Sequence, residues 1–194
     1  MMTTTPATTK RGDHLHAVRF YQDSDSLARL VSEFIGEGFQ ASLPAIVIAT
    51  PEHREAIGKH LQAKGFDVGR LEADGALFLL DAQALLSRIM VDGMPESRLF
   101  RNALIPIIET ACKGREDCVI RAYGEMVDVL WKADQTVAAV RLETLWNELA
   151  QTHAFSLLCG YSMGNFYKGT THQEICSHHT HVLSDSGEAQ SAIS

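Results

Sequence analysis

The chain has 194 residues, of which 45% are hydrophobic, and its formal net charge is −7. This length and apolar content are sufficient for one domain with a buried core. The negative net charge argues against a basic face that would attract phosphates, so we expect no direct contact with nucleic acid.

The N-terminal segment and the cysteines bear on localisation. Met1–Lys10 is rich in Thr and lacks the apolar stretch of a signal peptide, and no apolar run approaches the roughly 18 residues of a membrane span. The four cysteines form no CxxC pair, which favours reduced thiols. We therefore expect a cytoplasmic protein that makes no membrane contact.

Short apolar runs predict five strands, because each is rich in strand-forming residues and lies between turn residues. In chain order they are His16–Gln22, Ala45–Ala49, Ala76–Leu80, Cys118–Tyr123 and Phe155–Tyr161. Longer helical segments separate these runs. The pattern predicts an α/β fold, with a mainly parallel central sheet flanked by helices in three layers.

The segments between the strands carry apolar side chains at helical spacing. The predicted helices begin at Asp23 or Ser24, at Pro51, at Ala82, near Phe100, at Gly124 and at Gln135, and a last short one spans Gln173–His181. We expect Gly36 and Gly38 to end the first helix and Pro106 to kink the fourth. Residues 1–13 and 184–194 are small and polar, which predicts unstructured tails around one folded region, residues 14–183.

In a sheet of this kind the ligand site lies at the carboxyl ends of the strands. A phosphate-binding loop there needs glycines, whose amides point inward, together with a Lys and a Ser or Thr. The turn Gln22–Leu27 after the first strand holds Asp23 and Asp25 but no glycine and no lysine. These carboxylates would repel a triphosphate. They either cap the following helix or line a cavity suited to a neutral or cationic ligand.

Other polar residues near strand ends are candidate ligand contacts: Tyr21, Thr50, Glu52, His53, Arg121, Tyr123 and Glu125. Arg121 needs a carboxylate partner, Glu125 or Glu143, and belongs either to a structural ion pair or to the ligand site. A magnesium-dependent ATPase would carry a carboxylate near the end of a central strand, whereas Arg121 has the opposite charge. Glu52 and His53 either transfer protons or bind a metal, or they occupy an exposed helical turn.

A tract of potential metal ligands lies near the C-terminus: His172, Cys176, His178, His179 and His181. A helix would place the first two on one face, where imidazole and thiolate can bind zinc or iron. A structural zinc site usually shows two ligand pairs, and this is a single tract. The default expectation is therefore a solvated helix end and no cofactor. His14 and His16 are expected to be surface or cap residues, and Cys159 is expected to be a small buried hydrophobe.

Several separate motifs in order resemble the MEDS domain, a family named for sensory regions of methanogen and methylotroph regulators, including a dichloromethane-responsive repressor. They are His16–Tyr21 with Asp23, Phe34 with Gly38, Ala49–Pro51 with His53, Arg121–Met126 with Leu130 and Trp131, Leu142 and Glu143 with Trp146 and Asn147, and Phe155–Tyr161. The resemblance runs from about His16 to Val182. It implies a RecA-like fold, similar to the core of the clock protein KaiC, in which the phosphate-binding loop (Walker A) is lost.

The resemblance also implies signal sensing in bacteria or archaea, commonly beside a DNA-binding or histidine-kinase output domain. Since the resemblance covers nearly all of the expected folded region, we expect no such domain in this chain. We therefore expect a non-catalytic sensor that binds a small molecule or a partner protein. It would signal by contacting a histidine kinase, a response regulator or a transcription regulator, or by forming a homodimer. Two alternatives stay open: histidine-kinase-like phosphotransfer through His53, and a metal or redox sensor built on the C-terminal tract.

Overall fold

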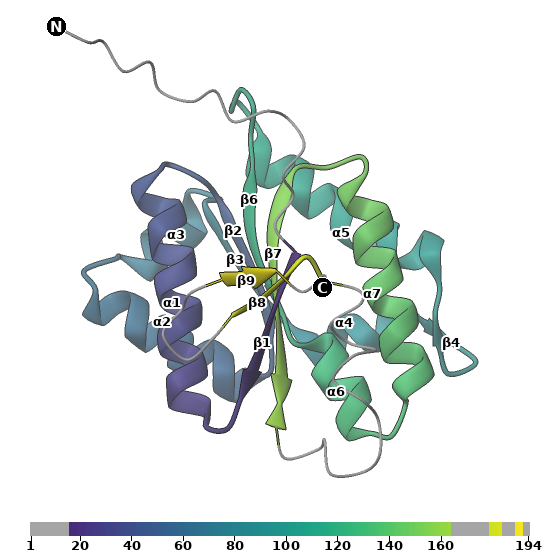
Figure 1. Ribbon diagram of the computed structural model, residues 1–194. Coiled ribbons are helices and arrows are strands. Elements are labelled where there is room, and N and C mark those ends of the chain that lie inside the picture. Colours follow the sequence, from purple (N-terminus) through teal and green to yellow (C-terminus); the bar gives the residue numbers. More distant parts are fainter. Residues whose placement is uncertain (1–15, 164–178, 184–188, 192–194) are drawn as a thin grey trace, which may run out of the picture.

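A computed structural model describes residues 16–163, 179–183 and 189–191, which build a central sheet between two helical layers (Figure 1). The strands are β1 (His16–Tyr21), β2 (Ala45–Ala49), β3 (Leu77–Asp81), β6 (Ile120–Gly124), β7 (Phe155–Ser162), β8 (His181–Leu183) and β9 (Ala189–Ser191), with a separate hairpin of β4 (Met90–Val91) and β5 (Met94–Pro95). The sheet order is β3-β2-β6-β7-β1-β8-β9. Neighbouring strands run parallel, except that β9 is antiparallel to β8.

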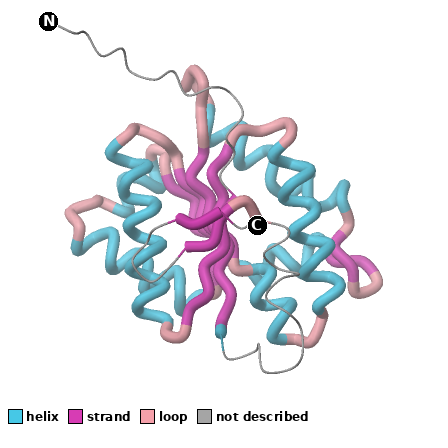
Figure 2. The backbone as a smooth tube through the Cα atoms, viewed as in Figure 1, coloured by secondary structure: helices cyan, strands magenta, loops and turns pink. Residues whose placement is uncertain are grey.

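Helices cover both faces of the sheet (Figure 2). One face carries α1 (Ser24–Gln40), α2 (Pro51–Ala63) and α3 (Val68–Ala73), and the other carries α4 (Ala82–Ile89), α5 (Ser97–Cys112), α6 (Met126–Lys132) and α7 (Thr136–Ala150) (Figure 1). Side chains alternate between faces along each strand. In β2, Val47 belongs to the core under α1 and α2, whereas Ile46 and Ile48 belong to the core under α4–α7. The predicted three-layer α/β sandwich is therefore confirmed.

The predicted elements differ from the structure mainly near the C-terminus. The five predicted strands form, and α5 continues through Pro106. The last predicted helix is wrong at its end, because His181 begins strand β8, and its residues 173–178 lie outside the described residues. Ala189–Ser191, in the predicted tail, pairs with β8. Residues 1–13 also lie outside the described part. Strands added at a sheet edge depend on long-range pairing, which local composition does not encode.

The prediction that Gly36 and Gly38 end the first helix is wrong, because α1 continues to Gln40. Both glycines allow a neighbour to approach the helix closely. A Cβ on Gly36 would lie 3.0 Å from Cε2 of Phe66, and one on Gly38 would lie 2.6 Å from Cγ of Arg121. These glycines serve packing rather than termination.

The expectation of four reduced thiols is wrong for one pair, since Cys112 and Cys118 form a disulfide with a Cα–Cα distance of 5.6 Å. The end of α5 and the turn into β6 bring these two residues together. Cys159 is a free thiol and is buried, as predicted, while Cys176 lies outside the described residues. None of the helices in the described ranges combines the length and the apolar character needed to cross a bilayer.

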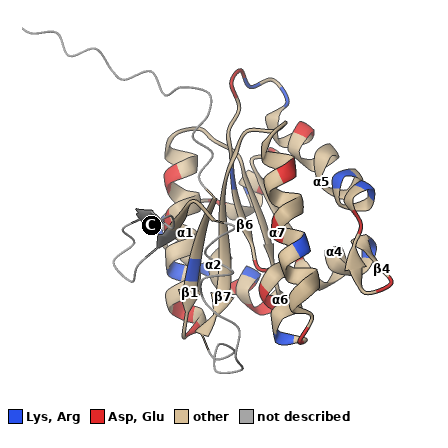
Figure 3. Ribbon diagram, turned by 45° about the vertical axis from the view of Figure 1, so that its right-hand side comes forward, with Lys and Arg blue, Asp and Glu red and all other residues tan. Residues whose placement is uncertain are grey.

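Charged side chains of both signs are interspersed over the helices in the view of Figure 3. Several form exposed pairs one helical turn apart, such as Asp25 with Arg29 and Glu55 with Lys59. Solvent and salt screen exposed pairs of this kind. They neutralise charge locally and contribute little to fold stability.

Two glycine substitutions test the close packing of α1. We expect Gly38→Ala to lower the free energy of unfolding by about 1–3 kcal/mol, because the new methyl group would overlap the stem of Arg121. Gly58→Ala in α2 is the matched control. No atom lies within 4 Å of its added Cβ, so helix propensity should raise stability by up to about 1 kcal/mol. Urea denaturation of both variants measures the difference, and equal effects would contradict the assignment.

Candidate functional site

The carboxyl edge of the sheet borders a cleft of about 560 Å³, where the candidate ligand site was expected. Of the predicted contacts, the cleft is lined by Tyr21, Thr50, Glu52 and His53. It is also lined by polar residues outside the predicted set of ligand contacts: Gln22, Ser24, Gln83, Asp128, Lys132 and Ser162. Strands and helices far apart in the chain therefore supply one polar cavity.

A buried carboxylate lies directly behind the cleft. Glu125, which is 1% exposed, follows β6 and contacts Nδ1 of His53 through Oε2 at 2.6 Å. It also accepts hydrogen bonds from the backbone N–H of Thr50 and, at 3.1 Å, from the hydroxyl of Tyr123. The other ring nitrogen of His53 lies 3.0 Å from Oγ of Ser24. The expectation that His53 is exposed is wrong, since α2 turns it inward to this carboxylate.

The contact shifts the pKa of each partner toward its charged form. The hydrogen bond with Glu125 raises the pKa of His53 above its ordinary value, although burial opposes the shift. Burial by itself raises the pKa of Glu125, but the contacts with His53 and the Thr50 amide outweigh it and leave the pKa lowered. The carboxylate is thus charged and fully engaged at neutral pH.

A second buried carboxylate anchors α6 to the sheet at the edge of the cleft. Asp128, 2% exposed, accepts the hydroxyl of Tyr21 at 2.9 Å and the backbone N–H of Ser162 at 2.9 Å. Lys132 Nζ lies 2.6 Å from Asp128 and donates to the Tyr21 hydroxyl at 3.2 Å. Burial, together with the charge of Asp128, raises the pKa of Tyr21 well above its ordinary value. Tyr21 is therefore neutral and donates to Asp128.

The two aspartates of the first turn lie at the surface. Asp23 is the N-cap of α1, and its Oδ1 accepts the N–H of Ser26 at 2.8 Å, which lowers the pKa of Asp23. The capping interpretation is confirmed for Asp23. Asp25 contacts Arg29 at 2.8 Å and His60 at 3.0 Å. Neither carboxylate lines the cleft. The Asp23 carboxylate accepts a backbone N–H at the helix N-terminus that would otherwise be available to an anion.

Arg121 lies away from the cleft. It is the second residue of β6, and its guanidinium stacks over the ring of Phe34, 4.7 Å from the ring centroid. The predicted ion pair with Glu125 or Glu143 is wrong, because both carboxylates contact histidines instead. The argument that Arg121 replaces a strand-end carboxylate is also wrong. Glu125 occupies that end, although it is buried and already paired.

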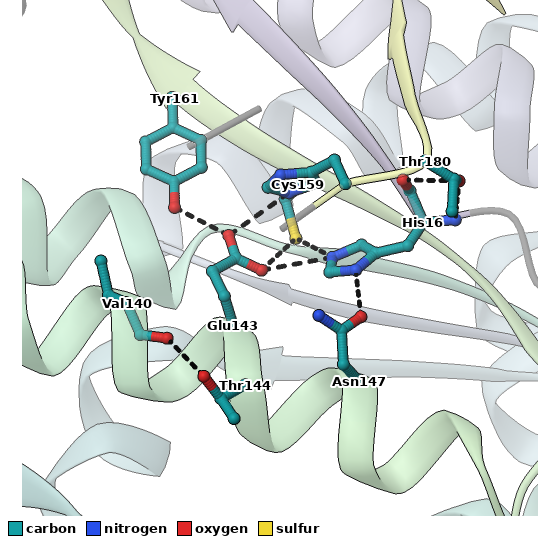
Figure 4. Close-up of polar contacts among 9 residues, drawn as sticks. His16, Val140, Glu143, Thr144, Asn147, Cys159, Tyr161 and Thr180 are labelled. Atoms are coloured by element: carbon teal, nitrogen blue, oxygen red, sulfur yellow. Dashed lines mark hydrogen bonds and ion pairs between the residues drawn. The ribbon is translucent and has the colours of Figure 1, made fainter. Parts of the chain in front are cut away.

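A second cluster lies under α7 (Figure 4), on the opposite face of the sheet from α2 (Figure 1). The Glu143 carboxylate contacts Nε2 of His16 at 3.2 Å and Nε2 of His179 at 3.3 Å. Cys159 Sγ lies 3.4 Å from His16 Nε2, and the hydroxyl of Tyr161 donates to Glu143 at 2.7 Å. Burial raises the pKa of Glu143, but the facing imidazoles outweigh this effect and hold the pKa well below its ordinary value.

The sequence did not predict this cluster. The expectation that His16 is at the surface is wrong, because β1 is covered on this face by α7. Of the C-terminal tract, His179 joins the cluster, and His181 contacts its neighbour Thr180 instead. His172, Cys176 and His178 lie outside the described residues. The available signal was Glu143 itself, a carboxylate between Leu142 and Trp146 on the buried side of α7.

The chain is similar to one protein family and to a solved structure of the expected fold. The model of the MEDS family, the MEthanogen/methylotroph, DcmR Sensory domain, matches residues 15–179. A KaiC-like protein from the hyperthermophilic archaeon Pyrococcus horikoshii OT3 superimposes with a TM-score of 0.57 at 12% identity, over 86% of this chain and 70% of that chain. This similarity shows the fold alone and confirms the RecA/KaiC-like architecture. No curated protein sequence matches the chain.

The His53–Glu125 contact predicts a specific pH response. Because the folded-state pKa of His53 lies above 6.5, its stabilisation is complete below that pH and is lost as pH rises through the folded-state value. The folded-state pKa of Glu125 is lowered, so the stabilisation that its carboxylate contributes is lost only when the pH falls through that pKa. We expect Glu125→Gln to shift the titration of His53 down, as followed by NMR. Asp25→Asn is the control and should leave it unchanged. An unaltered His53 titration in Glu125→Gln would contradict the pairing.

Proposed function

The chain belongs to the MEDS family of sensory domains, and we propose that it is a non-catalytic sensor that binds a small neutral or cationic organic molecule in the cleft. The observation that carries this proposal is the polar cleft at the carboxyl edge of a RecA/KaiC-like sheet. The turn beside it has an acidic helix cap where a phosphate-binding loop would need glycines and a lysine.

The charges around the cleft support this ligand class. The Asp128 carboxylate lies against the Lys132 side-chain amine, and the Glu125 carboxylate lies against the His53 imidazole. Glu52, by contrast, is exposed and lines the cleft. Its negative charge disfavours an anion and favours a neutral or cationic molecule. The volume of about 560 Å³ falls within the range of small-molecule sites.

Helix α6 supplies a route for the signal. Asp128 of α6 is held by contacts with Tyr21 and Lys132, and a ligand that binds either of these side chains would weaken its contact with Asp128. Trp131 of the same helix packs edge-on against Tyr161, with ring centroids 5.9 Å apart. A shift of α6 would therefore reach β7 and the outer surface of this layer. The receiving protein is, in this proposal, a histidine kinase, a response regulator, a transcription regulator or a second copy of the chain.

A thermal-shift and calorimetric screen of small neutral and cationic organic molecules tests the binding function. A ligand at 100 times its Kd should stabilise the fold by about 2.7 kcal/mol. For a cationic ligand we expect Glu52→Gln to weaken binding by up to about fivefold, the value of an exposed charge pair. Glu55→Gln is the control, because it removes an exposed carboxylate from the same helix, outside the cleft.

The outcome that would overturn the sensor proposal is catalytic turnover of a nucleotide. Magnesium and ATP would have to stabilise the protein, and ATP hydrolysis would have to be lost in Glu125→Gln.

Phosphotransfer through His53 stays a prediction. Both ring nitrogens of His53 are in contact, one with Glu125 and the other with Ser24, so a phosphoryl group would have to displace one of these partners.

One arrangement in the cleft favours a second candidate, acyl transfer. Ser24, His53 and Glu125 follow the order of a nucleophile, a base and a residue that orients the base, with contacts of 3.0 and 2.6 Å. Ser24 Oγ would attack an ester carbonyl while the neutral form of His53 takes its proton and passes it to the leaving alkoxide. Water would then release the acid from the acyl-serine. Asp23 weighs against this reaction, because its carboxylate occupies an amide that would stabilise the oxyanion.

The acyl-transfer candidate has a direct test. Hydrolysis of an activated ester, or covalent labelling by a fluorophosphonate, should be lost in Ser24→Ala and kept in Ser26→Ala, a neighbouring serine that does not line the cleft. Equal ester turnover or labelling in both variants, or neither activity in the wild type, would remove this candidate and leave the binding function standing.

A further inference from the structure

Four side chains of metal-binding type converge between β1, β7 and α7 (Figure 4). His16 comes from β1, Cys159 from β7, Glu143 from α7 and His179 from the residues just before β8. Their ligand atoms all lie within 4.8 Å of one another, and all four side chains are buried. We propose that these four residues form a site for one divalent transition metal ion, for which Zn²⁺ is the best fit.

The distances in the cluster are close to those of a tetrahedral zinc site. Zinc binds nitrogen and oxygen at about 2.0–2.2 Å and sulfur at about 2.3 Å, so neighbouring ligand atoms lie about 3.3–3.6 Å apart. Oε2 of Glu143 lies 3.2 Å from Nε2 of His16, whereas the other carboxylate oxygen, Oε1, lies 3.3 Å from Nε2 of His179. Cys159 Sγ lies 3.4 Å from His16 and 3.8 Å from Glu143. Small movements of these four side chains would complete a tetrahedral coordination shell around one ion.

The surrounding hydrogen bonds orient the ligands as metal sites require. Nδ1 of His16 lies 2.8 Å from Oδ1 of Asn147. An N–H donated to that amide oxygen leaves the lone pair of Nε2 directed at the cluster. The Tyr161 hydroxyl donates to Glu143 at 2.7 Å and fixes the carboxylate. Thr180 bonds the backbone of His16 through its N–H at 2.7 Å, which holds the adjacent His179 in place.

Charge balance favours a divalent ion in this buried position. One thiolate and one carboxylate neutralise a 2+ charge, and two neutral imidazoles complete the coordination. The thiol proton of Cys159 passes to solvent on binding. Because Glu143 is 1% exposed and Cys159 is 0% exposed, the site has the closed character of a structural centre. It would join β1, α7 and β7 to the segment that leads into β8.

Metal analysis of the full chain, prepared without an affinity tag, tests the proposal. After chelator treatment and reloading with Zn²⁺, we expect one zinc per chain. Cys159→Ser should weaken zinc binding by at least about 100-fold, since it removes a ligand rather than an outer partner. The control replaces the other members of the tract, as His172→Ala, Cys176→Ser and His178→Ala together. It should keep one zinc with unchanged affinity.

Substitution with Co²⁺ gives a second measurement. The wild type and the tract control should show the same thiolate-to-cobalt charge-transfer band, and Cys159→Ser should lack it. Should Cys159→Ser fail to fold, the wild type and the tract control still decide. No stoichiometric metal in the wild type, or loss of the metal or the band in the tract control, would overturn the site. Neither result would affect the ligand cleft, which is tested separately.

The hydrogen bond from His16 to Asn147 adds a graded test. Asn147→Ala should keep one zinc per chain but weaken its binding by about 10–100-fold, because the imidazole loses its orienting partner. Thr144→Ala is the matched control on the same helix. Its hydroxyl donates to the carbonyl of Val140 and not to the cluster, so zinc affinity should not change. Equal zinc affinities in the two variants would contradict the role of Asn147.

Discussion

The buried contact between Glu125 and His53 holds together the elements that frame the cleft. Glu125 follows β6, Thr50 lies between β2 and α2, and the far nitrogen of His53 reaches Ser24 of α1. Breaking a buried pair by removing one partner costs about 3–5 kcal/mol, because an uncompensated charge is left behind. The carboxyl edge of the sheet is therefore organised around one charge that is already satisfied within the protein.

The cleft at the carboxyl edge and the cluster under α7 are connected through α6 and β7. Asp128 bonds the backbone of Ser162, and the adjacent residue, Tyr161, donates to Glu143 in the cluster under α7. Trp131 packs against the same tyrosine. A shift of Asp128 at the cleft, or of Trp131 in the same helix, would therefore be transmitted to the cluster through side chains in direct contact. Such a connected network is a reasonable physical basis for coupling between two sites, provided that both bias one movable element.

The likeness to a KaiC-like protein separates fold from chemistry. At 12% identity the two chains share a sheet and its helical layers. In this chain the turn after β1 is an acidic cap, in which the Asp23 carboxylate accepts the Ser26 amide. A common architecture can carry unrelated sites at the same strand ends, because function depends on the side chains placed there. Membership of a sensory family agrees with the polar cleft.

The sequence alone determined the alternation of strands and helices, because apolar periodicity and capping residues act over a few neighbouring positions. It also determined that the turn at Asp23 lacks phosphate-binding glycines. The tertiary structure decided the partners of the buried charges. Arg121, Glu125, Glu143 and His16 each have several carboxylates or histidines elsewhere in the chain as potential partners, and only strand order and helix packing select among them. Pairing across more than a hundred residues, as between His16 and Glu143, leaves no local pattern in the sequence.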